Sequence, residues 1–248
     1  MQTSGVLASF SLRMRSVASA RGTWWVVVVL VLIQSAVSLA GGHEQLAGLY
    51  QALGVTRQLV LSGELWRLVT YGLLHGGWAH VTLNALCLLM LGARIEGILG
   101  KMAVWRTLIL GVIAGGIFHV LAVPGGVDAP ILVGISGGCM ALLILLTTLS
   151  PESRMWPLPV SARSLGVGVM AAEFLLALMD PRLGVPVFSD GGKMLVQHGF
   201  GGWFAVGHAC HFGGGLAGFL IGRWLLRPRI TADRLRRERE QREAKRRV

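Results

Sequence analysis

The stretch Ile131–Leu149 reads ILVGISGGCMALLILLTTL and carries no charged side chain. Its length approaches the roughly 20 apolar residues that a helix needs to cross the hydrocarbon core of a bilayer. A membrane-spanning β-strand would instead alternate polar and apolar residues over about ten positions. The stretch therefore predicts a transmembrane helix, and it puts Ser136, with glycines close on either side, near the start of that helix.

The rest of the 248-residue chain extends this pattern. Apolar residues make up 53% of it and charged residues only 14%, where a soluble domain carries about a quarter. The predicted fold class is thus an all-α membrane protein, a six-transmembrane-helix bundle. Its spans are expected near Trp24–Ala40, His80–Ile98, Val104–Val123, Ile131–Leu149, Leu165–Met179 and Gly207–Leu226. The expected domains are an N-terminal segment (1–23), the six-helix domain (24–226) and a basic tail (227–248).

The basic residues predict the orientation and the surroundings of the chain. The net charge is +11, but this charge sits at span ends and in the tail, where it would meet anionic lipid headgroups rather than nucleic acid. Cytoplasmic loops carry an excess of Lys and Arg. The charge distribution therefore predicts that both termini are cytoplasmic, with membrane lipids as partners. The excess of Arg over Lys, together with frequent Gly and Ala, indicates a bacterial plasma membrane.

Two long loops, Gly41–Ala79 and Pro181–Val206, then lie on the outer side. Loops of this length usually have a function. Their apolar and aromatic content is typical of segments that rest in the headgroup layer.

Ser136 and His211 are the first candidate pair for chemistry. Gly134 and Gly137 leave space around the serine, and the N–H groups at a helix start favour negative charge. A histidine inside a membrane helix is costly to bury and is a functional candidate by default. Gly214 and Gly218 follow His211 at helical spacing, and this smooth face is expected to bring the histidine to the serine. His208, one turn earlier, is the rival base.

A second pair, His80 and Asn84, shares one helix face because the two residues are four apart. Side-chain donors at this position would suit the oxyanion of a tetrahedral intermediate. The predicted topology puts both pairs at a similar depth below the outer surface. A metal site built from His75, His80 and His119 is the alternative, but these residues lack a compact spacing and a nearby carboxylate, so no metal is expected.

At these positions the chain resembles the rhomboid intramembrane proteases. The resemblance runs from about Glu64 to Gly222 and comprises five elements in order. They are Glu64-Leu65-Trp66-Arg67; His75, His80 and Asn84; Glu96 and Gly100; Gly134, Ser136 and Gly137; and His211, Gly214 and Gly218.

The resemblance implies a fold, an activity and a role for each element. Ser136 and His211 would form a catalytic dyad without an acidic third member. His80 and Asn84, with the Ser136 backbone N–H, would form the oxyanion hole. Structural positions near the site would be His75, Trp66, Arg67, Glu96 and the four glycines of the serine and histidine motifs, with Arg67 and Glu96 tying the first loop to the bundle. No cofactor is implied.

The substrates implied are transmembrane segments of other proteins, with the second outer loop and the fifth span as the gate. Family members often carry an aromatic residue four positions after the nucleophile, and Met140 stands there in this chain. A methionine can pack on a ring, so we expect the pair to persist with looser placement of His211.

Three other functions fit parts of the pattern. A non-proteolytic relative that binds membrane segments would usually lack the serine or the histidine. A transporter would need more charged residues near the midplane than Glu173 and His119. A protease that trims C-terminal sorting segments would share the same chemistry. The oligomeric state is left open.

Overall fold

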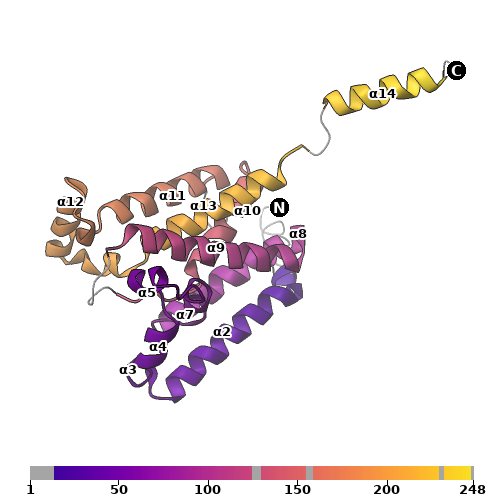
Figure 1. Cartoon of the computed structure of the whole chain (residues 1–248). Helices are drawn as coiled ribbons and strands as arrows, with labels where there is room; N and C mark the ends of the chain where they lie inside the picture. Colours follow the sequence, from indigo (N-terminus) through magenta and orange to yellow (C-terminus); the bar gives the residue numbers. More distant parts are fainter. Residues whose placement is uncertain (1–13, 125–129, 155–158, 229–231, 247–248) are drawn as a thin grey trace, which may run out of the picture.

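The computed structural model describes residues 14–124, 130–154, 159–228 and 232–246, drawn as ribbon in Figure 1. Within these ranges the chain is helical, with connecting loops and two isolated β-bridges, Val55–Leu132 and Arg154–Ser161. The prediction of an all-helical chain is confirmed at this level. Residues 1–13 of the predicted N-terminal segment, and 229–231 and 247–248 of the predicted tail, lie outside the described residues.

The long helices lie close to the predicted spans. Helix α7 continues through a π-helical turn, η2, into α8, so that Trp78–Leu99 is one apolar helix. The helices at the six predicted spans are α2 (Arg21–Leu39), α7 (Trp78–Cys87) with η2 (Leu88–Gly92) and α8 (Ala93–Leu99), α9 (Lys101–Ala122), α10 (Ser136–Leu149), α11 (Ala162–Leu178) and α13 (His208–Leu225).

Three of these helices are long and apolar enough to cross a membrane, judged over the described residues: α2, Trp78–Leu99 and α9. Helix α13 meets the combined requirement of length and composition only together with the segment Phe188–Ala205, from which it is bent by 52°. Helix α10 has 14 residues, or roughly 21 Å at 1.5 Å per residue, less than the hydrocarbon thickness of about 30 Å. Length and composition therefore identify several membrane helices, and the count of six stays a prediction.

Helix α10 is shorter than the predicted span because its first residues are not helical. The prediction began the span at Ile131, whereas the helix begins at Ser136. Gly134 has a φ of +113°, a left-handed conformation that glycine adopts at little cost. Leu132 forms a β-bridge with Val55 of the first loop. The five residues before Ser136 are thus a non-helical approach to the helix rather than its first turn.

Helices α9, α10 and α13 pack against one another, and glycines make this close contact possible. A Cβ on Gly214 of α13 would overlap the carbonyl oxygen of Gly137, and one on Gly218 would overlap that of Ala141. On the other side, a Cβ on Gly111 of α9 would overlap Ala141. Without a hydrophobic drive between helices in lipid, such close backbone approach supplies much of the packing energy.

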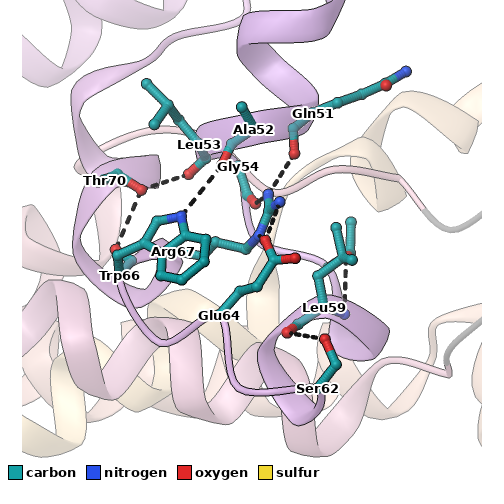
Figure 2. Close-up of polar contacts among 11 residues, drawn as sticks. Gln51, Ala52, Leu53, Gly54, Leu59, Ser62, Glu64, Trp66, Arg67 and Thr70 are labelled. Carbon is teal, nitrogen blue, oxygen red and sulfur yellow. Dashed lines mark hydrogen bonds and ion pairs between the residues drawn. The ribbon is translucent and has the colours of Figure 1, made fainter.

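The loop between α2 and α7 folds into short helices around Arg67, shown in Figure 2. The buried Arg67 guanidinium pairs with Glu64 and donates to the backbone carbonyls of Gln51 and Gly54. Thr70 donates to the Leu53 carbonyl at 2.8 Å. The elements of this loop are α3 (Gly42–Gln45), α4 (Ala47–Leu53), α5 (Arg57–Leu61), α6 (Arg67–Thr70) and the 3-10 turn η1 (Tyr71–Leu73). Because the arginine serves a carboxylate and two carbonyls at once, it holds the loop in one shape. These partners all lie within the loop, whereas the prediction had Arg67 tying the loop to the bundle.

The loop between α11 and α13 holds the 3-10 turns η3 (Pro181–Leu183) and η5 (Gly201–Ala205), with α12 (Phe188–Leu195) and the π-helical turn η4 (Val196–Phe200) between them. Phe188, Phe200 and Trp203 are exposed, and contact of this loop with lipid headgroups stays a prediction. The charged helix α14 (Ala232–Arg246) extends away from the bundle at the upper right of Figure 1.

Candidate active site

Ser136 and His211 come together where α10 and α13 pack. Ser136 is the first residue of α10, and His211 lies in the first turn of α13. The His211 Nε2 atom is 2.8 Å from the Ser136 Oγ atom. The close approach of Gly214 to Gly137, one turn beyond this contact, allows the two side chains to reach each other. Such a contact can move a proton from a hydroxyl to an imidazole.

His80 and Asn84 of α7 face the same place from the other side. A Cβ on Gly134 would lie 2.6 Å from the His80 ring and 3.7 Å from Asn84 Nδ2. Gly134 is therefore required twice, by its left-handed φ and by the ring that packs on it. Asn84 is buried, and its Nδ2 atom has no hydrogen-bond partner among the residues that the structure describes. This amide is a free donor beside the serine loop, the segment 131–136 that leads into α10.

The tautomer of His80 follows from its backbone contact. The Gly76 N–H donates to His80 Nδ1 over a long 3.4 Å, so the ring proton is on Nε2. That nitrogen lies on the side of Gly134. His80 thus presents a second N–H donor next to Asn84.

The first loop sets the backbone in front of Ser136. Val55 and Leu132 exchange backbone hydrogen bonds of 3.0 Å, and the Gly134 N–H donates to the Tyr71 carbonyl at 2.9 Å. Tyr71 is fully buried, and its hydroxyl donates to the Val112 carbonyl of α9 at 2.7 Å. The spacing of the motifs does not predict these contacts, because each joins residues more than 40 positions apart in the sequence.

His75 and Trp66, predicted as structural positions, both lie in this loop system. The His75 carbonyl accepts a hydrogen bond of 2.7 Å from the Tyr50 hydroxyl, and its side chain is buried. The Trp66 indole N–H reaches the Ala52 carbonyl at 3.5 Å (Figure 2), and the residue is exposed.

The expectation that Glu96 ties the first loop to the bundle near the site is wrong. Its two carboxylate oxygens accept from the N–H groups of Gly22 and Thr23 and from the Thr23 hydroxyl at 2.8–2.9 Å. Glu96 therefore caps the start of α2, where a carboxylate satisfies free N–H groups. It lies sixteen residues beyond His80 in one helix, roughly 24 Å away. Arg57 ties the loop instead, by donating to the carbonyls of Val120 and Leu121 at the end of α9.

Glu173 and His208 complete the surroundings of His211. Glu173 of α11 has Oε1 3.0 Å from His211 Nδ1 and Oε2 2.7 Å from His208 Nδ1. His208, the rival base in the sequence, makes its other contact with the Trp203 carbonyl at 2.8 Å. The signal that could have found this group was Glu173 itself, since ionisable residues in membrane helices are functional candidates.

The same group is where the described residues bring three potential metal ligands together. The ligand atoms of Glu173, His208 and His211 lie within 4.8 Å of one another. The alternative set of His75, His80 and His119 forms no such group within the described ranges. Each carboxylate oxygen of Glu173 lies at hydrogen-bond distance from the Nδ1 atom of a different histidine. This is the arrangement of a carboxylate shared by two imidazoles.

A cavity of about 660 Å³ lies between α10, α11 and α13 on the far side of this group. Its walls are largely apolar, with Phe174 and Phe212 at one end and Arg163 and Arg223 at the other. Neither Ser136 nor His211 lines it. The cavity is therefore separate from the contact between Ser136 and His211.

Comparison with known proteins adds an independent finding. The family model described as "Rhomboid domain" matches residues 62–228. Among curated proteins, "RHOMBOID-like protein 5" of Arabidopsis thaliana is 27% identical over 171 residues, 68% of this chain and 47% of the relative. "Rhomboid-related protein 2" of Mus musculus is 28% identical over 161 residues, 64% of this chain and 47% of the relative.

A third relative matches a shorter part. "Rhomboid-related protein 3" of Homo sapiens is 34% identical over 83 residues, 34% of this chain and 20% of the relative. The chain thus spans less than half of the length of each of these curated relatives. Whole-protein properties of the relatives do not transfer on these matches.

Proposed function

Because this chain belongs to the rhomboid family, we propose that it is an intramembrane serine endopeptidase with Ser136 as nucleophile and His211 as general base. The single observation that carries the proposal is the 2.8 Å contact between His211 Nε2 and Ser136 Oγ. A serine hydroxyl is a weak nucleophile until an adjacent base removes its proton. The imidazole has a proton affinity suited to that task near neutral pH.

The reaction follows from these positions. His211 Nε2 takes the Ser136 proton as Oγ attacks the carbonyl carbon of the scissile bond. The protonated imidazole then gives that proton to the leaving amine, and the acyl group stays on Oγ. A water molecule next loses a proton to His211 and attacks the ester carbonyl, which releases the acid and restores the serine. This chemistry needs no cofactor.

The oxyanion of each tetrahedral intermediate needs donors placed in advance. The free Nδ2 amide of Asn84 and the Nε2–H of His80, both beside Gly134, supply two of them. The backbone N–H of Ser136 at the start of α10 supplies a third. A buried amide without a partner costs about 1–3 kcal/mol. The unpaired Asn84 amide supports the proposal because an oxyanion would give it a partner.

We propose transmembrane segments of other proteins as substrates. The protein would cross the membrane six times, with both termini on the cytoplasmic side and Ser136 near the outer face. The basic tail would meet anionic lipid on the inner face. The proposed location in a bacterial plasma membrane rests on composition, since the matched relatives come from a plant and two mammals.

Labelling with a fluorescent fluorophosphonate tests the activated serine directly. Wild type, Ser136→Ala and His211→Ala are purified in detergent and checked for folding by thermal unfolding. We expect labelling of the wild type and none of either variant. A well-folded wild type that neither labels nor cleaves a model transmembrane substrate in liposomes would contradict the proposal and favour a membrane-segment-binding relative.

A further inference from the structure

Three titratable side chains from two helices form one continuous hydrogen-bonded group behind Ser136. Glu173 of α11 uses one carboxylate oxygen for His211 at 3.0 Å and the other for His208 at 2.7 Å. All three side chains are largely buried, between 10% and 16% exposed. A buried carboxylate in a membrane helix is costly unless it is fully paired, so this arrangement has a structural and energetic reason to persist.

The protons in this group can be assigned from donor and acceptor chemistry. The Ser136 hydroxyl donates to His211 Nε2 in the reactive arrangement, so the ring's own proton is on Nδ1 and is donated to Glu173. Trp203 offers a carbonyl, which only accepts, so His208 donates to it from Nε2. Glu173 Oε2 also accepts, so His208 donates from Nδ1 as well.

His208 with a proton on both nitrogens carries a positive charge that balances the carboxylate. His211 is then neutral, with its free nitrogen turned to Ser136. When His211 takes the serine proton during attack, the carboxylate 3.0 Å from Nδ1 stabilises the imidazolium. Glu173 keeps its negative charge throughout, as the acidic member of a serine protease triad does.

We propose that Glu173 is the acidic third member of a Ser136–His211–Glu173 triad and that His208 holds its carboxylate in place. This inference rests on the proposed function and changes it, since the resemblance implies a dyad without an acid. Glu173 acts through His211 and not on substrate, so it is a positioning residue. It fixes the tautomer and the ring orientation that the base needs.

The matched variants are Glu173→Gln at the site and Glu152→Gln as control. Glutamine keeps the size of the side chain and removes its negative charge. Glu152 is exposed and pairs with Arg163 at the opposite end of α11, so its variant makes the same chemical change away from the site. Both proteins, the wild type and His208→Gln are purified as full chains, and their thermal unfolding is compared.

The measurements are the fluorophosphonate labelling rate and the kcat and KM for a model transmembrane substrate, each from pH 5 to 9. We expect Glu173→Gln to lower kcat by about 10²-fold, within the range for general base catalysis, with little change in KM. We also expect its rate profile against pH to differ from that of the wild type, because His211 loses the carboxylate that accepts its Nδ1 proton. Glu152→Gln should match the wild type.

A purely structural role for Glu173 would lower the unfolding temperature and leave the pH profile of the folded fraction unchanged. His208→Gln should reduce kcat in the same direction by up to about tenfold, and it carries the test if Glu173→Gln does not fold. Wild-type rates and profiles in both variants would overturn the inference while leaving the Ser136 proposal intact. Wild-type protein that shows no labelling beyond that of Ser136→Ala would instead overturn the proposed function.

Metal binding at the same three residues would give a different result. Wild-type labelling would then respond to EDTA or to added Zn²⁺, because a metal on the two Nδ1 atoms would replace both hydrogen bonds to Glu173. We expect no stimulation by Zn²⁺ and no loss with EDTA. Stimulation by Zn²⁺ that requires Glu173 would overturn the triad.

Discussion

Asn84 shows how an unfavourable residue position can indicate a catalytic role. Its side chain is buried in α7, and the Nδ2 amide has no partner among the described residues. Burying an unpaired amide destabilises a protein by about 1–3 kcal/mol. The amide points toward Gly134, next to the serine loop, so an oxyanion formed there would satisfy it.

Replacing Asn84 by alanine should therefore reduce activity without reducing stability. We expect kcat for a model transmembrane substrate to fall by about 10²–10³-fold, the usual effect of removing one oxyanion donor. The unfolding temperature should stay the same or rise, because a buried unpaired polar group is removed. Unchanged kcat with unchanged folding would show that this amide does not serve the reaction.

His75 makes the stability of the first loop depend on pH. Burial of its side chain lowers the pKa of His75 from 6.5 to about 4. Between these values the unfolded chain binds a proton that the folded chain does not. The neutral imidazole thus contributes full stability above about pH 6.5, and this contribution is lost as the pH falls toward 4.

The prediction is that the wild type loses up to about 3 kcal/mol of unfolding free energy from this group between pH 6.5 and 4. His75→Gln should show a smaller loss over that range, because glutamine does not titrate. Thermal unfolding in detergent across the range measures the difference. Parallel pH dependence in the two proteins would assign the effect to other groups.

At the scale of elements, backbone contact through glycine decides how α10 sits against its neighbours. Gly214 and Gly218 of α13 lie against the carbonyls of Gly137 and Ala141. These contacts set the separation of the two helices and hence the distance between Ser136 and His211. Positioning of the pair is thus a property of the helix interface and not of either motif alone.

Gly218→Ala should disturb both stability and activity. The added methyl would overlap the Ala141 carbonyl, and overpacking of this kind costs about 1–3 kcal/mol. We expect a lower unfolding temperature and slower fluorophosphonate labelling. Gly168→Ala in α11 is the control: its Cβ would meet nothing within 4 Å, so stability should be equal or higher. Equal behaviour of both variants would contradict the interface model.

For the whole molecule, the predicted topology separates the loops into two sides of the membrane. Glu44 follows the first predicted span, and Glu152 follows the fourth, so this topology predicts that the two lie on opposite sides. It also predicts that Arg239, in α14 of the tail, shares the side of Glu152. All three side chains are exposed.

Single cysteines at these positions, in a variant without the native cysteines, test this arrangement. With intact cells and a membrane-impermeant maleimide, we expect Glu44→Cys to react, and Glu152→Cys and Arg239→Cys to react only after the membrane is opened. Reaction of Glu44→Cys and Glu152→Cys from the same side would show that the number of spans between them is not three.

The sequence by itself determined where the membrane helices run and to which family the chain belongs. Lipid offers no partners to backbone groups, so an apolar stretch of sufficient length must be helical. The observed helices accordingly follow the predicted ranges, within a few residues for all but α10. The five motif elements indicated the rhomboid family, which the family model confirms over residues 62–228.

The tertiary structure alone decided what surrounds the candidate pair. The start of α10 at Ser136 depends on pairing of Leu132 with Val55, which hydrophobicity along the chain cannot encode. Glu96 was misplaced because its partners at Gly22 and Thr23 are more than 70 positions away. The contact of Glu173 with His211 depends on the rotation of α11 against α13. Apolar content sets the length of a helix in lipid, whereas only packing sets which face it turns to its neighbour.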